Sequence, residues 1–376
     1  MYDTAIIGGG LTGCATAWRL AEDGAKVILL ERDEINSAAS GANAGSLHVQ
    51  IPHDPFVRLG PDWAAAFSQT LPLLLDSIDL WREVESRLGT DLEVSMTGGL
   101  LVAASEAEMR QIERKAAIER AAGVTVELLS ASALKDRAPY LSGRLTGGAY
   151  CPTEGKANPL LCAPAFAKAA NRLGASLLSG CEVAAIERGR EGFELTTSQG
   201  LVKARRIVNA AGAASGRIAQ MAGMRMDIEA FPIQLSVTAP AAPLVSHLVY
   251  AAAEKLTLKQ TRAGSIIIGG GWPARLDAAG RPVVDPKALA RNVKLAVDTV
   301  PGLADVELLR TWAAFVNGNA DWRPIIGEAP GAPGFFMAYA PWIGFTASLA
   351  TASIVADLAQ GKTPQTRADL SCFAPR

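Results

Sequence analysis

The chain has 376 residues, of which 49% are hydrophobic and 19% charged, and this composition excludes a disordered protein. Its 36 Lys and Arg residues nearly balance 37 Asp and Glu residues, so the chain has no basic excess with which to hold a nucleic-acid backbone. The length is too great for one ordinary hydrophobic core and predicts two domains.

Cysteine and histidine give no sign of a bound metal. The five cysteines include no C-x-x-C pair and the three histidines join no cluster with metal-ligand spacing, so we expect reduced thiols and no metal. The longest apolar segment, residues 342–358, is interrupted by small polar residues and Asp357, which is typical of a buried helix rather than a membrane span. No leader with a basic start and an apolar run precedes the first predicted strand, so we expect a cytoplasmic protein.

The first predicted elements form a βαβ unit. Residues 2–7 and 26–31 are continuous apolar runs, as in buried parallel strands, and residues 11–23 between them carry a helical apolar stripe that ends at Gly24. A strand, a glycine turn, a helix and a second strand within about 30 residues are typical of an α/β fold.

Helical and extended patterns alternate along the rest of the chain. No linker or repeat separates them, so we expect the chain to cross between its two domains several times and one domain to be discontinuous. Helices are predicted at 71–89, 105–122, 159–173, 286–299 and 344–359, a buried strand at 206–211, and antiparallel strands within 245–260 and 264–272.

A glycine motif, GGGLTG at 8–13, follows the first predicted strand and opens the first helix. This context is what the G-x-G-x-x-G dinucleotide fingerprint requires. Gly8 permits the tight turn, Gly10 lets a pyrophosphate approach the backbone, and Gly13 lets the helix pack closely on the strand. The helix N-terminus, with Leu11 and Thr12, then offers free N–H groups to the phosphates.

Glu31 and the segment after it indicate which dinucleotide binds. A carboxylate at the end of the second strand accepts hydrogen bonds from ribose hydroxyls and repels a 2′-phosphate, which favours FAD or NAD over NADP. Residues 32–48 are small, polar and glycine-rich at the point where an NAD domain enters its next helix. Such a segment suits a backbone that passes close under a flat ring, and the alternative is an ordinary surface loop. The candidate flavin contacts here are Arg32, Ser40, Asn43, Ala44, Gly45 and Leu47.

Two later segments agree with a flavin. Residues 207–212 end a strand with small residues, which lets the glycine turn pack nearby. Residues 341–348 lead into the last helix, whose N-terminal dipole suits the negative charge on the N1–C2=O edge of a reduced flavin. The alternative is an ordinary helix start with no role in flavin binding. The further candidate contacts are Val183, Ala211, Gly212, Ile343, Gly344, Phe345 and Thr346.

Together these motifs resemble the D-amino-acid oxidase superfamily of flavoproteins, which includes glycine oxidase and sarcosine oxidase. The resemblance covers almost the whole chain. It rests on AIIGGGLTGCATAWRLAEDGAKVILLER at 5–32, ASGANAGSLH at 39–48, VNAAG at 208–212, DWRPIIG at 321–327 and IGFTASLATA at 343–352. The segments ANAGSLHVQ (42–50) and IIIGGGWP (266–273) are most similar to the B-type chain of opine oxidases, which act on octopine or nopaline.

The resemblance implies an α/β fold with two domains. A discontinuous, Rossmann-like FAD-binding domain would carry an α+β substrate domain built on an antiparallel sheet. It also implies hydride transfer to flavin N5 from the substrate carbon next to nitrogen. No cysteine lies convincingly at a flavin edge, so we expect FAD to be bound non-covalently. We predict residues 1–85, 145–225 and 318–376 for the FAD-binding domain and residues 86–144 and 226–317 for the substrate-binding domain.

The chain departs from the simple oxidases of this superfamily where they bind the substrate carboxylate. The resemblance implies an arginine just before the last helix, but residues 340–345 (APWIGF) contain none. A desolvated carboxylate needs a cation or several donors, so either another residue supplies the charge or the substrate differs. The candidate substrate contacts are Arg323, Lys259 and Tyr250, with Lys255 and Arg262 as further cations; solvated surface positions are the alternative for the cations.

His48 and Trp342 are the candidate catalytic residues. His48 ends the flavin segment and is placed to accept the amine proton, or else is a structural histidine. Trp342 precedes the flavin-facing helix and is placed to face the substrate. Trp272, Trp312 and Trp322 are further candidates for an apolar pocket, with a place in the core as the alternative.

We expect an FAD-dependent enzyme that oxidises the C–N bond of an amino-acid-derived amine. An opine-type secondary amine is the first choice, with this chain as the catalytic subunit of a multisubunit dehydrogenase whose partner subunits carry additional redox centres. One alternative is a stand-alone oxidase of the glycine, D-amino-acid or sarcosine type that produces hydrogen peroxide. Another is a non-catalytic flavin-binding subunit or a tRNA-modifying flavoprotein, and the near-neutral charge counts against RNA.

Overall fold

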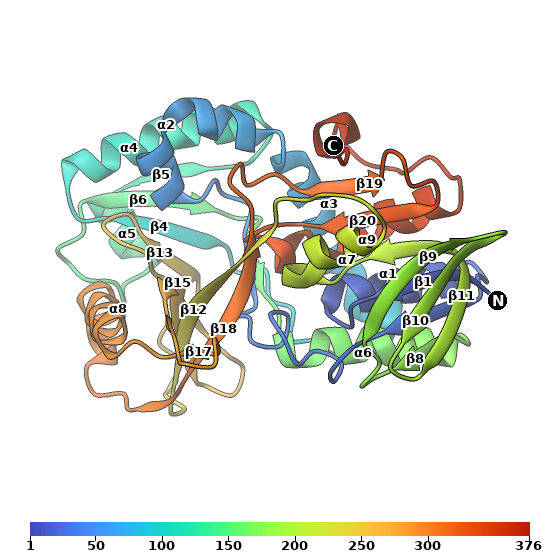
Figure 1. Ribbon diagram of the computed structural model, residues 1–376. Helices are drawn as coiled ribbons and strands as arrows, with labels where there is room; N and C mark the ends of the chain where they lie inside the picture. The colour runs from blue at the N-terminus through green and yellow to red at the C-terminus, as the bar shows by residue number, and fades with distance from the viewer.

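The computed structural model describes residues 1–376 and contains two eight-stranded sheets with helices packed against them. The two sheets lie side by side in different halves of the molecule, and both chain ends lie in the half that holds the first sheet (Figure 1). None of the helices combines the length and the hydropathy needed to cross a bilayer. The architecture confirms the predicted α/β class.

The first sheet has a parallel core. Strand β1 (Tyr2–Ile7) pairs in parallel with β2 (Val27–Leu30) and with β11 (Gly200–Asn209), as the predicted βαβ unit requires. All four residues of β2 are buried, in keeping with a strand covered on both faces. The order from edge to edge is β19 (Ile325–Glu328), β20 (Phe335–Tyr339), β11, β1, β2 and β8 (Ser176–Leu178), with the hairpin of β9 (Val183–Gly189) and β10 (Gly192–Thr197) attached to β11.

Helices cover one face of this sheet. The helix α1 (Leu11–Glu22) packs against α6 (Pro159–Arg172) and α9 (Gly344–Ala359), and α9 packs in turn against α3 (Leu71–Leu88). The buried positions of α1 and α9 are mostly Ala, Gly, Ser and Thr, which lets the helix axes approach closely. The short helix α7 (Ser215–Met221) and strand β9 pack on the opposite face.

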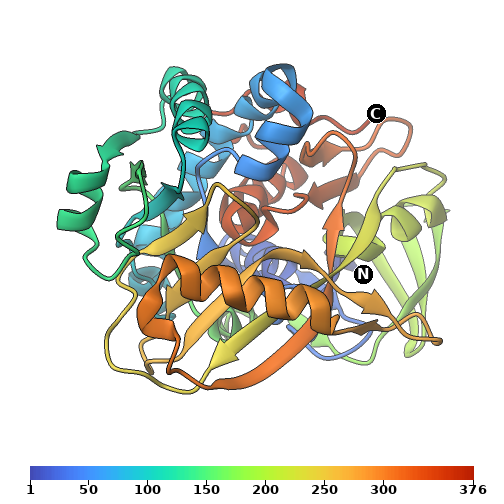
Figure 2. The ribbon, with the colours of Figure 1, turned by 90° about the vertical axis from the view of Figure 1, so that its left-hand side faces the viewer.

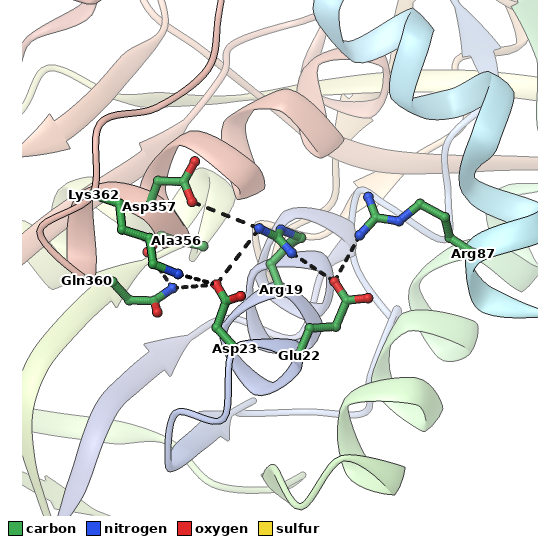
Figure 3. Close-up of polar contacts among 8 residues, drawn as sticks. All are labelled: Arg19, Glu22, Asp23, Arg87, Ala356, Asp357, Gln360 and Lys362. Atoms are coloured by element: carbon green, nitrogen blue, oxygen red, sulfur yellow. Dashed lines mark hydrogen bonds and ion pairs between the residues drawn. The ribbon is translucent and has the colours of Figure 1, made fainter.

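A network of charged side chains joins α1 to α3 and α9 at the surface (Figure 3). Glu22 accepts hydrogen bonds from Arg19 at 2.9 Å and from Arg87 at 3.0 Å. Asp23 accepts a hydrogen bond from Lys362 at 2.9 Å. All these side chains are partly exposed, so each pair stabilises the fold by less than about 1 kcal/mol.

The second sheet is antiparallel except where β4 pairs with β13. One of its faces is covered by α8 (Pro286–Thr299), which lies across the sheet in Figure 2. Strand alternation separates the two faces: Leu100 and Val102 pack in the core beneath α8, whereas Leu101 faces the opposite way. The strand order is β18 (Leu308–Gly318), β12 (Glu229–Thr238), β15 (Ile266–Pro273), β14 (Thr257–Gln260), β13 (Leu248–Ala251), β4 (Gly99–Ala103), β6 (Gly147–Cys151) and β5 (Glu127–Ser130).

The remaining elements are shorter or lie at the edges. Helices α2 and α4 pack against each other, and two small ribbons pair β3 with β7 and β16 with β17. These elements are α2 (His53–Ser68), α4 (Glu106–Ala121), α5 (Ala131–Arg137), β3 (Ser46–Leu47), β7 (Gly155–Lys156), β16 (Arg275–Leu276), β17 (Pro282–Val283) and the 3₁₀ turns Gly212–Ala214, Pro301–Leu303 and Leu370–Phe373.

Most elements predicted from the sequence are confirmed, several to within one or two residues at each end. The helix α2 was not predicted, because Pro55, Gly60 and Pro61 interrupt its pattern, and the backbone kinks at Gly60 with φ of 84°. The long strands β12 and β18 were also missed. The division into domains remains a prediction, but β6, which we grouped with residues 145–225, is a strand of the second sheet.

Candidate active site

A cavity of about 1150 Å³ is lined by both halves of the molecule. One part of its wall comes from the glycine turn and the chain after β2, and another from the first turn of α9. The rest comes from the face of the second sheet that α8 does not cover, including side chains of β12, β13 and β18. The size suits a dinucleotide together with a small substrate.

The glycine turn forms one end of this wall. Gly8 adopts φ of +113°, and a Cβ there would lie 2.4 Å from the carbonyl oxygen of Ala210 at the end of β11. Helix α1 begins after Gly10, an N-cap residue that makes no side-chain hydrogen bond, and Leu11 N–H donates to Ser40 Oγ at 3.0 Å. The turn is therefore a narrow backbone cradle that fits a phosphate group.

The predicted contacts in the turn are placed as follows. Leu11 and Thr12 line the cavity together with Gly8 and Gly10. Gly13 does not line it; a Cβ at Gly13 would lie 2.0 Å from the Gly8 carbonyl oxygen, so this residue serves the packing of α1 on the turn.

Glu31 lines the cavity directly after β2. Its Oε2 accepts the Gly9 N–H at 2.6 Å and its Oε1 accepts the Asp33 N–H at 2.9 Å. Two backbone donors thus orient the carboxylate, and each oxygen retains a lone pair for a further donor such as a ribose hydroxyl. Arg32 also lines the cavity.

The small-residue segment after Glu31 divides into two groups. Ser40, Asn43 and Ala44 line the cavity, whereas Gly45 and Leu47 do not. Leu47 is fully buried because it belongs to β3, whose alternation turns its side chain into the core while Ser46 and His48 face the cavity. Direct flavin contact by the side chain of Leu47 is therefore not supported by its position.

The first turn of α9 borders the cavity. Ile343, Gly344 and Phe345 line it, and α9 begins without a side-chain cap. The starts of α1, α2, α3 and α7 also lack a side-chain cap, whereas α4, α5, α6 and α8 are each capped by a Ser, Asn or Asp side chain. Thr346 is buried and does not line the cavity; its Oγ1 accepts the His48 N–H at 2.8 Å. Val183, Ala211 and Gly212 lie in the wall as predicted.

His48 and Tyr250 form a pair in the cavity wall. His48 Nδ1 lies 2.5 Å from the Tyr250 hydroxyl, and the residues come from positions 202 apart in the chain. Burial, with a smaller contribution from Lys259, lowers the pKa of His48 to about 3, so its ring is neutral at physiological pH. Burial also raises the pKa of Tyr250 well above its usual range, so Tyr250 keeps its proton.

A buried polar cluster next to this pair was missed in the sequence. Lys115 and Glu119 form an ion pair at 2.5 Å with both side chains fully buried. Lys115 also donates to Gln50 Oε1 at 3.2 Å, and Gln50 Nε2 donates to Glu154 Oε2 at 3.0 Å. No local pattern signals this cluster, because its members come from three separate parts of the chain.

Aromatic rings form the wall beside α9. Trp342 lines the cavity, and its ring stacks on Trp322 with centroids 4.8 Å apart and lies 4.7 Å from Phe231. Both tryptophans have positive φ, 57° and 63°, which is strained for a bulky residue. Trp322 also lines the cavity, whereas Trp272 and Trp312 do not.

The structure brings only one of the four predicted cations to the cavity. The Arg323 guanidinium donates to the carbonyl oxygen of Cys372, because the 3₁₀ turn Leu370–Phe373 packs against β19, which begins just after Arg323. Lys259 is fully buried, donates to Ser46 Oγ and does not line the cavity; burial lowers its pKa to about 7. Arg262 pairs with Asp91 at the surface. Lys255 alone of these four lines the cavity.

Comparison with known proteins agrees with this geometry. Residues 3–358 match the family described as "DAO: FAD dependent oxidoreductase". The chain is 29% identical to the B-type chain of opine oxidase from Rhizobium meliloti, over 100% of this chain and 97% of that protein. It is 28% identical to glycine oxidase of Geobacillus kaustophilus, with 99% and 96% covered. A crystal structure of L-proline dehydrogenase from P. horikoshii superposes with a TM-score of 0.87 at 25% identity, with 100% and 96% covered. The chain therefore belongs to the DAO family of FAD-dependent oxidoreductases, flavoproteins that act on amines or amino acids.

Proposed function

We propose that this enzyme oxidises an opine-type secondary amine and is the catalytic subunit of a multisubunit dehydrogenase. The observation that carries the proposal is the wall before α9, where Trp342 lines the cavity and residues 340–345 lack the arginine that the resemblance to the simple oxidases implies. An apolar ring contacts an alkyl part of the substituent on the amine nitrogen and does not hold a carboxylate, so the carboxylates of an opine need another partner, and Lys255 is the predicted cation that lines the cavity. The similarity to a chain of opine oxidase over the whole length supports the same substrate class.

The residues of the cavity wall fit FAD. The glycine turn would hold the pyrophosphate, Glu31 a ribose, and the segment from Ser40 to Ala44 the side of the flavin ring. The uncapped start of α9 would face the N1–C2=O edge. When bound, the flavin supplies a hydride acceptor. Four of the predicted contacts do not line the cavity and would instead stabilise the backbone of the residues that do: Gly13, Gly45, Leu47 and Thr346.

The chain's own side chains would prepare the substrate. An amine must be neutral before its carbon gives up a hydride, so a group in the wall must take its proton. His48 is placed for this role, because its Nε2 has no hydrogen-bond partner within the chain, and the lowered pKa of its ring means that it would pass the proton on rather than retain it. Trp342 would cover the nitrogen substituent and exclude water beside the reacting carbon.

Anaerobic mixing tests the substrate class. The FAD-loaded protein would be mixed with octopine, nopaline, sarcosine, glycine, proline and D-alanine, and the loss of the visible flavin absorbance recorded. We expect the fastest bleaching with octopine or nopaline. Bleaching by glycine or D-alanine but not by the opines contradicts the opine proposal, and absence of bleaching by every amine favours a non-catalytic flavin-binding subunit.

The electron acceptor that reoxidises the reduced flavin tests the multisubunit proposal. The similar chains of opine oxidase and of one sarcosine oxidase are each named as one subunit of their enzyme, which supports partner subunits for this chain. Those partners would carry further redox centres. We expect the purified chain to reduce an artificial dye and to form little hydrogen peroxide. Steady peroxide formation by the single chain in air would favour a stand-alone oxidase, the role suggested by the similarity to glycine oxidase. A cytoplasmic location remains a prediction.

A further inference from the structure

Glu154 is a fully buried carboxylate in the cavity wall. Its Oε1 accepts the N–H groups of Val49 at 2.7 Å and Gln50 at 2.8 Å, the residues that follow His48. Its Oε2 accepts Gln50 Nε2 at 3.0 Å. Burial raises the pKa of Glu154, but all three of these neighbours are N–H donors, and donors stabilise the ionised form. Glu154 is therefore a carboxylate that accepts hydrogen bonds.

The carboxylate reaches the Tyr250 side of the second sheet because Gly99 has no side chain. A Cβ on Gly99 would lie 1.8 Å from Glu154 Oε2. Gly99 begins β4, the strand that pairs with β13, and β13 carries Tyr250. Glu154 is also the acidic residue that, after burial, raises the pKa of Tyr250. The Glu154 carboxylate and the Tyr250 side chain therefore lie on the same face of the sheet, close enough for the charge of Glu154 to act on the Tyr250 proton.

Because Tyr250 has only one proton, a bond from its O–H to Glu154 would fix the bond to His48. The Tyr250 oxygen would then accept at His48, and the Nδ1 that lies 2.5 Å away would carry a hydrogen. A neutral imidazole has one N–H, so Nε2 then bears a lone pair. Nε2 has no partner in the chain and is not among the enclosed polar atoms, while His48 lines the cavity.

We infer that Glu154, acting through Tyr250, holds His48 in the tautomer whose bare Nε2 faces the substrate amine. Glu154 is thus a positioning residue, and this inference rests on the proposed amine chemistry. The substrate N–H bond breaks as an Nε2–H bond forms on His48. The Nδ1 proton moves to the Tyr250 oxygen, and the Tyr250 proton moves to Glu154, so one proton passes from substrate to carboxylate. The opposite tautomer would set an N–H donor against the substrate ammonium.

Nitrogen NMR of the histidine rings tests the tautomer without any substrate. The chain has only three histidines, so selective ¹⁵N-histidine labelling of the FAD-loaded protein gives few signals, and the variant His48→Asn assigns one set. We expect the His48 signals to show a protonated Nδ1 and an unprotonated Nε2 in the unmodified protein. A protonated Nε2 there overturns the inference, whether or not any variant folds.

Two variants and one control identify the residue responsible. Glu154→Gln replaces an acceptor with a donor and should move the His48 proton to Nε2, and Tyr250→Phe should release the ring to a mixture of tautomers. Asp54→Asn removes a carboxylate from the same cavity wall, where Asp54 lies 3.7 Å from Lys255, and should leave the His48 signals unchanged. An unchanged His48 tautomer in folded Glu154→Gln contradicts the inference.

The reaction rate separates this inference from the proposed function. With an amine that bleaches the unmodified protein, Glu154→Gln should slow flavin reduction roughly 100-fold, the scale of a lost proton acceptor. The affinity for the amine should change much less, because Glu154 does not touch it. If no amine bleaches the flavin, the proposed function fails, whereas the NMR result still decides the tautomer.

Discussion

The fit of the glycine turn to FAD can be tested with the substitution Gly8→Ala. In the structure, Gly8 has φ of +113°, and an added Cβ would lie 2.4 Å from the Ala210 carbonyl oxygen and 2.9 Å from the Ala211 Cα. Both neighbours are backbone atoms of the adjacent strand end, so neither can rotate away. The turn must therefore move toward the cavity or remain strained.

The distances give the size of the effect. An ordinary contact needs about 1 Å more than the 2.4 Å available. A shift of that size takes a backbone N–H beyond hydrogen-bond range of a phosphate, and one such charged hydrogen bond contributes about 1.5–3 kcal/mol. Because about 1.4 kcal/mol is a factor of ten, we expect the Kd for FAD to rise by about 10- to 100-fold. Strain from the positive φ costs a further ~1–3 kcal/mol of folding stability.

Flavin fluorescence quenching during titration of the FAD-free protein measures the Kd, and thermal melting reports the strain. The control is Gly143→Ala, at a glycine with no neighbouring atom within 4 Å of the added Cβ. We expect the control to bind FAD as the unmodified protein does. A Kd for Gly8→Ala within threefold of the unmodified value, with an unchanged Tm, would refute the assignment of this turn to the pyrophosphate.

Three further predictions follow from buried and surface charges. Lys115→Met should lower the free energy of unfolding by about 3–5 kcal/mol, because Glu119 stays buried without its partner; a loss below 1 kcal/mol in urea titration argues against a dry ion pair. The fold lowers the pKa of His48 from 6.5 to about 3. Between these two pH values the unfolded chain binds more protons than the folded chain, so the free energy of unfolding rises with pH. His48→Gln should reduce this slope by up to about 1.4 kcal/mol per pH unit, and an unchanged slope in urea titrations at pH 5 and 6 contradicts the assignment. Arg19→Ala should cost less than about 1 kcal/mol, and a larger loss shows that the charges in Figure 3 act as a cooperative unit.

The sequence predicted those helices, strands and turns that a local sequence pattern is sufficient to identify. The helices at 286–299 and 344–359 agree with α8 and α9 at both ends, because each has a clear start and a continuous helical pattern. The glycine turn was predictable for a similar reason, since strand, turn and helix are adjacent in the chain. Helix α2 was not predictable, because Pro55 and Pro61 are typical of helix ends and the fold tolerates both.

Contacts between residues that are far apart in the sequence could not be predicted from local patterns. His48 was singled out from its place after the flavin segment, but nothing near it indicated Tyr250 as its partner. Glu154 was missed because its bonds to the backbone at residues 49–50 depend on how the two sheets meet. Arg323 was misplaced for the same reason: its motif fixes its position along the chain but not the direction of its side chain.

The cavity wall combines the earliest and the latest parts of the chain. Residues 7–12 contribute one portion, and residues 338–345 contribute another that only the last tenth of the chain supplies. A ribosome must therefore synthesise the chain through residue 345 before the wall is whole. We expect a nascent chain arrested before residue 338 to capture no FAD, so that cofactor loading follows synthesis rather than guiding it.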